Sequence, residues 1–139
     1  NRVQLLTDKI ILKSKLKKGD TVTLLGLSFK PNTDDIRDST SLKISNLLSS
    51  HGINIKTYDP EAMKQAKLEN NELILCKDAY EACEETRAII IGTEWNEFRA
   101  LDFKKIKENT KNIVIFDLRN IYNAKELIEL GFEYYGTGK

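Results

Sequence analysis

Proline, histidine and long apolar runs are scarce in this sequence of 139 residues, which holds two prolines and one histidine. No apolar run approaches the roughly 20 residues that span a bilayer, and no signal peptide is visible. No internal repeat, low-complexity tract or linker divides the chain, whose length suits one domain. These absences argue against a membrane protein, and we expect a single globular domain in the cytoplasm.

The two cysteines, Cys76 and Cys83, are too far apart for a Cys-x-x-Cys motif, and His51 is the only histidine. A tetrahedral zinc site needs more ligands than these, so we expect no bound metal. Two alternatives remain for the cysteines. Either one of them forms a catalytic pair with His51, or both are reduced and packed in a core, which is the interpretation we favour.

Charge of one sign is not in excess either, since 22 lysines and arginines stand against 21 aspartates and glutamates. The largest basic group lies within residues 13–18, where it has the pattern of the solvated end of a helix. Proteins that bind nucleic acids or membrane surfaces carry a basic stripe, which this sequence does not show. We therefore expect neither kind of partner.

Short apolar runs alternate with segments of helical spacing along the whole chain. This alternation is typical of β-α-β crossovers and predicts an α/β fold with a mostly parallel sheet. We expect a three-layer, doubly wound, Rossmann-like domain with five to six strands, preceded by an amphipathic N-terminal helix over residues 3–16. The expected strands are 21–25, 53–58, 73–75, 88–92, 113–116 and 132–135; the other expected helices are 40–51, 61–66, 78–85, 103–108 and 124–130.

The stretch from Gly26 to Ser41 follows the first expected strand and carries Lys30 and Arg37. Arg119 follows the fifth expected strand in the same way. Because parallel strands end at one edge of a sheet, these three cations can face one crevice. Cations beside a helix N-terminus suit a diphosphate, since guanidinium and ammonium groups form charge-assisted hydrogen bonds with phosphate oxygens.

Other polar and aromatic residues lie at the same strand ends and have two interpretations. Phe29 and Trp95 are either platforms for a base or sugar, or core residues. Asp34 and Asp35 are turn residues rather than catalytic acids on our interpretation. The remaining polar residues that we place at this edge are Ser28, Thr33, Thr93, Glu94, Asp117 and Asn120.

Each cation also has a structural interpretation. A lysine or arginine in a loop is commonly a solvated surface residue, and Arg119 can pair with the nearby Asp117. The glycine fingerprint of dinucleotide-binding domains does not follow the first strand, because Gly26 is followed by Leu27, Ser28, Phe29 and Lys30. A ligand at this site would therefore be held by side chains.

The motif Gly-Leu-Ser-Phe-Lys-Pro-Asn-Thr-Asp-Asp-Ile-Arg-Asp-Ser, which starts at Gly26, closely resembles the signature that opens the C-terminal domain of the UDP-glucose/GDP-mannose dehydrogenase family. The resemblance covers nearly the whole chain in the right order. It continues through Tyr58-Asp59-Pro60, Thr93-Glu94-Trp95-Asn96-Glu97-Phe98, Phe116-Asp117-Leu118-Arg119-Asn120 and Gly131-Phe132-Glu133-Tyr134-Tyr135-Gly136.

The resemblance implies that the full-length enzyme oxidises the C6 alcohol of a nucleotide sugar to a carboxylate in two NAD-dependent steps. In this family the C-terminal domain binds the UDP part of the substrate. Phe29, Lys30 and Arg119 would then contact the UDP-sugar, and Arg37 would reach NAD held mainly by an N-terminal domain. The UDP-glucose branch fits the motifs best; UDP-N-acetyl-hexosamine and GDP-mannose dehydrogenases are the alternatives.

The family's NAD fingerprint and catalytic cysteine have no counterpart in this sequence, so we expect no catalytic residue here and no activity of this part alone. Residues 1–18 would be a helix that joins a missing central domain, and residues 19–139 the UDP-sugar-binding domain. The other two domains of the chain would be its partners, within a homo-oligomer of the full-length enzyme. The rival hypothesis is a noncatalytic oligomerisation module, motivated by the broad apolar face of residues 3–16.

Overall fold

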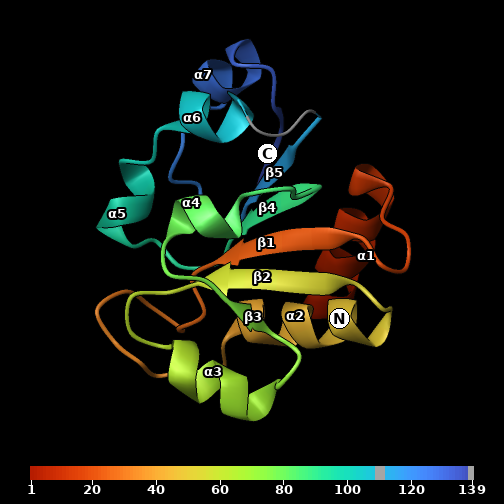
Figure 1. The fold of residues 1–139 in the computed structure, drawn as a ribbon, viewed down its shortest axis with the longest axis vertical. Helices are drawn as coiled ribbons and strands as arrows, with labels where there is room; N and C mark the ends of the chain where they lie inside the picture. The colour runs from red at the N-terminus through yellow and green to blue at the C-terminus, as the bar shows by residue number, and fades with distance from the viewer. Residues whose placement is uncertain (109–111, 138–139) are drawn as a thin grey trace.

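Residues 1–108 and 112–137 are described by a computed structural model, which contains a parallel sheet of six strands and seven helices in these residues. The end of the expected domain at residue 139 lies outside the described residues. The strands follow the order β3-β2-β1-β4-β5-β6, and every neighbouring pair is parallel. The expected α/β, Rossmann-like fold is confirmed (Figure 1).

The strands lie close to their expected positions, and β3, the shortest, has two residues. The strands are β1 (Thr21–Leu25), β2 (Asn54–Tyr58), β3 (Ile74–Leu75), β4 (Ala88–Ile91), β5 (Val114–Asp117) and β6 (Glu133–Gly136). The helices are α1 (Arg2–Ser14), α2 (Thr40–Ser50), α3 (Met63–Glu69), α4 (Ala79–Ala82), α5 (Asn96–Arg99), α6 (Phe103–Glu108) and α7 (Ala124–Glu129). Helix α5 was not expected from the sequence.

Two apolar clusters cover the two faces of the sheet. Ile90 of β4 belongs to the cluster that α1, α2 and α3 close, whereas its neighbours Ile89 and Ile91 belong to the cluster that α4 to α7 close. Successive residues of a strand point to opposite faces, so a continuous apolar run such as β4 requires a helix layer on each side. The three-layer arrangement follows from this pattern.

Helix α1 packs on the domain through part of the broad apolar face expected from the sequence. Ile10 is buried at 1% exposure, and the guanidinium of Arg87 donates a hydrogen bond to the backbone oxygen of Ser14 (3.3 Å). Elsewhere on the same apolar face, Leu5 and Leu12 are 69% and 73% exposed. The N-terminal helix is therefore attached to the sheet and still presents two leucines to its surroundings.

Candidate functional site

The loop between β1 and α2 leaves the carboxyl end of the sheet, beyond the arrowheads of β1 and β2 in Figure 1. Strand β1 lies between β2 and β4, so the chain order reverses there. In open α/β sheets, ligands bind beside this switch point, outside the carboxyl ends of the strands. The fold therefore places the loop that carries Phe29, Lys30 and Arg37 at the position where a ligand is expected.

The switch point itself is filled by protein atoms. Gly26 has a φ of +95°, and a Cβ added there would lie 2.6 Å from atoms of Thr93. Thr93 Oγ1 donates a hydrogen bond to the backbone oxygen of Ser28 (2.7 Å), which joins the loops after β1 and β4. Both Thr93 and Ser28 are buried. Both residues lie at the carboxyl edge, as expected, but the Thr93 side chain joins the two loops and the Ser28 hydroxyl bonds the backbone oxygen of Lys30 within its own loop.

Asp59, at the end of β2, is fully buried and accepts five hydrogen bonds. Its Oδ2 accepts from the backbone N–H groups of Leu27 (2.7 Å) and Ser28 (3.3 Å) and from Trp95 Nε1 (3.3 Å). Its Oδ1 accepts from the backbone N–H groups of residues 61–62, both at 2.8 Å. One carboxylate therefore fixes the loops after β1, β2 and β4 against one another.

Asp117, at the end of β5, has a similar role in the next loop. It is fully buried and accepts hydrogen bonds from the backbone N–H groups of Arg119 (3.2 Å) and Tyr122 (3.0 Å) and from the hydroxyl of Tyr134 (2.7 Å). Burial, together with the hydrogen bond to Asp117, raises the pKa of Tyr134. Asp117 lies at the carboxyl end of β5, as expected, but its buried carboxylate positions the backbone that carries Arg119 and does not face outward.

Phe29 and Lys30 are exposed on the first loop. Phe29 is 49% exposed to solvent, and its backbone N–H donates a hydrogen bond to the backbone oxygen of Asp35 (3.0 Å). The hydroxyl of Ser28 donates to the backbone oxygen of Lys30 (2.7 Å), so the backbone of this pair is held while the side chains face outward. Trp95, the other aromatic candidate, is a core residue at 9% exposure.

Both arginines expected at the site are paired with carboxylates of the same chain. Arg37 bonds Asp35 through Nε (3.0 Å) and Nη2 (2.9 Å), and the hydrogen bond from its side chain lowers the pKa of Asp35 to about 2. Arg119 bonds Glu94, on the loop after β4, through Nε and Nη2, both at 2.9 Å. The partner of the Arg119 side chain is thus Glu94 and not Asp117, and this hydrogen bond lowers the pKa of Glu94.

The four site residues therefore fall into two groups. Lys30 and Arg37 share the first loop with Phe29, while Arg119 belongs to the loop after β5 and contacts the loop after β4. The contacts of Thr93 and Asp59 connect these loops through the switch point. That all three cations face one crevice stays a prediction.

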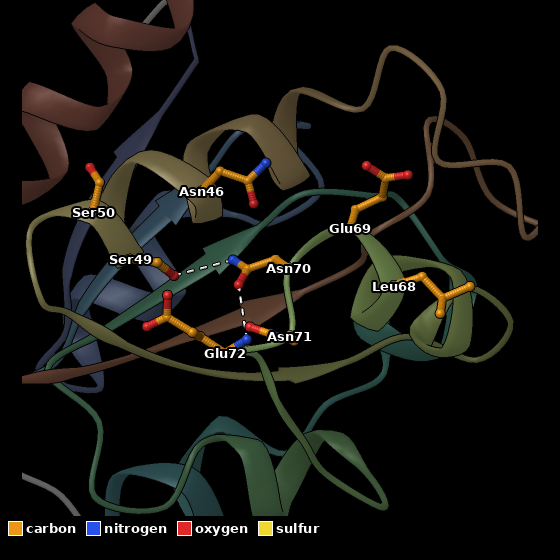
Figure 2. A pocket seen from close by; sticks show the side chains of 8 residues that line it. All are labelled: Asn46, Ser49, Ser50, Leu68, Glu69, Asn70, Asn71 and Glu72. Carbon is orange, nitrogen blue, oxygen red and sulfur yellow. Dashed lines mark hydrogen bonds between the residues drawn. The ribbon is translucent and has the colours of Figure 1, made fainter.

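A polar hollow of about 380 Å³ lies elsewhere, between the end of α2 and the end of α3 (Figure 2). Its amide and hydroxyl groups bond one another, as when Asn70 Nδ2 donates to Ser49 Oγ (3.2 Å). The charged residues that line it are Glu69 and Glu72, which would repel a phosphate. It does not compete with the switch point as a nucleotide site.

Sequence reasoning missed the roles of Asp59 and Glu94. Each bonds partners that are 25 or more positions away in the chain, so no local pattern reveals them. The sequence did mark both residues, which lie shortly after strands and belong to the motifs Tyr58-Asp59-Pro60 and Thr93-Glu94-Trp95, but it did not reveal their partners.

The described residues contain no group of three or more His, Cys, Asp or Glu side chains able to hold a metal ion. They also contain no helix long and apolar enough to cross a membrane. Cys76 and Cys83 are free and buried, and burial raises the pKa of Cys83 to about 12. Neither cysteine has a hydrogen bond to His51 within the described residues, so the structure favours core cysteines over a catalytic pair.

A doubly wound parallel sheet with a switch point beside its central strand is the architecture of Rossmann-like domains, here without the glycine-rich turn. Comparison with known proteins gives the family. Residues 23–124 match the family model described as "UDP-glucose/GDP-mannose dehydrogenase family, UDP binding domain". The chain belongs to this family.

Individual relatives agree with this assignment. A UDP-glucose 6-dehydrogenase of Rhizobium meliloti is 44% identical over 88% of this chain and 28% of its own length. A UDP-glucose dehydrogenase from Pyrobaculum islandicum superposes with a TM-score of 0.80 at 26% identity, over 96% of this chain and 29% of that chain. A UDP-D-ManNAc dehydrogenase from Pyrococcus horikoshii has a TM-score of 0.72 at 25% identity over the same shares. The chain thus spans less than a third of these relatives.

Proposed function

We propose that this chain is the UDP-sugar-binding domain of an NAD-dependent enzyme that oxidises UDP-glucose to UDP-glucuronate, a polysaccharide precursor. The observation that carries the proposal is the exposed Phe29–Lys30 pair at the switch point, together with Arg119, which is held against the loop after β4 at the same edge of the sheet. Lys30 and Arg119 would bind the phosphates, and Phe29 would contact the base or sugar. The family match and the name of the Rhizobium meliloti relative support UDP-glucose as substrate.

The residues of this chain do not fit a tightly held NAD. The turn after β1 is filled by Ser28 and Thr93, and the N-terminus of α2 is capped by Ser39, whose Oγ accepts from the backbone N–H of Leu42 (3.1 Å). We propose that NAD is held elsewhere in the enzyme and that Arg37, which is 87% exposed at its side chain, reaches it from this domain. No step of the oxidation is assigned to this chain, whose part is to bind and orient the nucleotide.

Further properties of the whole enzyme are part of the proposal. Residues 1–18 would join a central domain, and residues 19–139 would form the nucleotide-binding domain of a homo-oligomer. The free cysteines, Cys76 and Cys83, support a reducing compartment, and we propose the cytoplasm. The Pyrococcus horikoshii relative keeps a UDP-N-acetyl-hexosamine as the alternative substrate.

Calorimetric titration of this chain with UDP, and with ADP as the control ligand, tests the proposal. We expect UDP to bind more tightly than ADP, because the base contact is specific while the phosphates are shared. Lys30→Ala and Arg119→Ala should each weaken UDP binding by about 1.5–3 kcal/mol, the typical value of a charge-assisted hydrogen bond. Equal affinity for both nucleotides, unchanged by either substitution, would exclude a UDP site here.

A noncatalytic oligomerisation module is the second candidate, and the exposed Leu5 and Leu12 of α1 favour it. It predicts that the chain self-associates through α1 and that Leu5→Gln with Leu12→Gln abolishes association. Light scattering at high concentration separates the two functions: a strict monomer that binds UDP contradicts the module and supports the nucleotide-binding domain.

A further inference from the structure

Glu94 contacts one particular edge of the Arg119 guanidinium. Arg119 Nε donates to Glu94 Oε2 and Nη2 donates to Oε1, both at 2.9 Å. The side chains are 34% and 29% exposed, so the pair lies at the surface of the carboxyl edge and not in the core. A two-bond pair of this kind fixes the plane of the guanidinium as well as its position.

The remaining edge of the Arg119 guanidinium stays available to a ligand. A guanidinium has five N–H groups in a rigid fork. The pair with Glu94 uses one on Nε and one on Nη2, which leaves both N–H groups of Nη1 and the second one of Nη2. The Nη1–Nη2 edge that remains matches two oxygens of a phosphate.

Glu94 is itself held in place by both of its neighbours in the chain. Thr93 Oγ1 donates to the backbone oxygen of Ser28 (2.7 Å), and Trp95 Nε1 donates to the buried carboxylate of Asp59 (3.3 Å). The backbone of Arg119 is fixed separately by Asp117. The Glu94–Arg119 pair therefore connects two loops whose backbones are each fixed, and this holds the Arg119 side chain in place.

We propose that Glu94 is a positioning residue for Arg119: it binds the Nε–Nη2 edge and turns the Nη1–Nη2 edge toward a phosphate oxygen pair of the nucleotide. This inference rests on the proposed function. Ordering a long side chain in advance lowers the entropy lost on binding. The opposite role is a carboxylate that competes with phosphate for Arg119, and the two roles predict opposite effects of substitution.

Glu94→Asp is the decisive variant because it keeps the charge and shortens the side chain by one methylene, so that it loses the two-bond geometry. We expect UDP to bind about 2- to 10-fold more weakly, which corresponds to ordering one rotamer-rich side chain. The same substitution in an Arg119→Ala background should change nothing, because the residue through which Glu94 acts is gone. Unchanged or tighter binding in the first case, or an equal loss in both backgrounds, would overturn the proposal.

Glu97→Asp serves as the matched control. It makes the same chemical change three positions along the chain, where Glu97 accepts a hydrogen bond from the Tyr58 hydroxyl and not from Arg119. UDP affinity should equal that of the unchanged chain. A loss as large as that of Glu94→Asp would assign the effect to the local backbone and overturn the positioning role.

Two further measurements separate this inference from the proposed function. The NMR signal of the Arg119 Nε–H group, assigned by its disappearance in Arg119→Ala, should exchange slowly with water and should become fast in Glu94→Asp without any ligand. Inorganic pyrophosphate then replaces UDP as the probe. Binding of pyrophosphate but not UDP, with the loss in Glu94→Asp retained, overturns the proposed function and supports the positioning role. Binding of neither anion overturns both.

Discussion

Asp59 is a charged side chain with no exposed surface and no cationic partner, and it is stabilised entirely by five N–H donors. Four of these donors are backbone N–H groups, so the main effect of the carboxylate is to fix the course of the backbone. A buried charge is tolerated only when its hydrogen bonds are nearly complete. Asp59 therefore acts on Phe29 and Lys30 at a distance, through the start of the loop that carries them.

Asp59→Asn is expected to destabilise the fold by about 3–5 kcal/mol, because the new NH2 group faces donors and cannot accept from them. Whichever way the amide turns, at least two of the present hydrogen bonds are lost. The free energy of unfolding from urea titration measures the change. Asp34→Asn is the control: its exposed side chain accepts one bond from Gln65 Nε2 (2.8 Å), and we expect a change within about 0.5 kcal/mol. Similar losses in both variants would show that Asp59 has no special structural role.

The exposed candidate residues are easier to identify in the sequence than the residues that hold them in place, although their role as ligand contacts stays a prediction. Phe29, Lys30, Arg37 and Arg119 stand out in the sequence because they are polar or aromatic residues in the segments that follow strands, and this can be seen without knowing which residues surround them. The contribution of Asp59 depends on partners 31 to 36 positions away, and that of Glu94 on a partner 25 positions away. Only the fold brings these partners together.

At the scale of elements, the turn from β1 toward α2 is defined by close packing as well as by hydrogen bonds. Gly26 adopts a left-handed φ of +95°, and an added Cβ would come within 2.6 Å of Thr93. Gly19, at the other end of the same strand, has nearly the same φ of +94° with nothing within 4 Å of an added Cβ. The two glycines differ in their surroundings alone.

Gly26→Ala should therefore destabilise the chain more than Gly19→Ala. Both substitutions strain the backbone by about 1–2 kcal/mol, and Gly26→Ala adds an overlap that costs about 1–3 kcal/mol more. Thermal or urea unfolding of the two variants gives the difference directly. If Gly19→Ala is as damaging as Gly26→Ala, the backbone conformation explains both losses, and the packing of the loops after β1 and β4 contributes nothing.

The elements themselves were predicted well where a period is long enough to read. The buried strands β1, β4 and β5 have uninterrupted apolar or β-branched runs, and α2 has a clear helical spacing. Helix α5 was missed because its four residues are too few to show a period and Trp95 at its start provides no side-chain cap, whereas Asp78 caps the equally short α4. Helix α1 has a broad apolar face, and the sequence alone could not tell that Ile10 packs inward while Leu5 and Leu12 face outward.

For the whole molecule, the alternation of strands and helices in the sequence predicts a parallel sheet. It does not predict the strand order, which depends on which strands pair with one another in the folded chain. The observed order places β1 at the centre and the two-residue β3 at an edge. Ile74 and Leu75 of β3 are 46% and 41% exposed. The sheet is thus buried at its centre and partly exposed at this edge. We therefore expect the free energy of local opening to be lower at β3 than at β1.

The two buried cysteines can be used to compare opening at the edge strand β3 with opening at the centre of the sheet. Cys76 directly follows β3 and is held by a backbone hydrogen bond to the oxygen of Thr57 (2.9 Å). Cys83 ends α4, beside Thr23 of the central strand, which donates to the oxygen of Ala82. Burial raises the pKa of both thiols, to about 12 for Cys83. Because both side chains are buried, at 4% and 2% exposure, we expect a reagent to reach either one only when the structure opens.

Labelling with a thiol reagent at pH 8 should therefore be faster at Cys76 than at Cys83. In the Cys83→Ala variant, the remaining Cys76 becomes reactive when the edge strand opens locally. In the Cys76→Ala variant, Cys83 becomes reactive only when the core around β1 unfolds, and its labelling rate should follow the urea dependence of global unfolding. Equal labelling rates with the same urea dependence would contradict this prediction. They would mean that β3 opens only when the whole sheet unfolds.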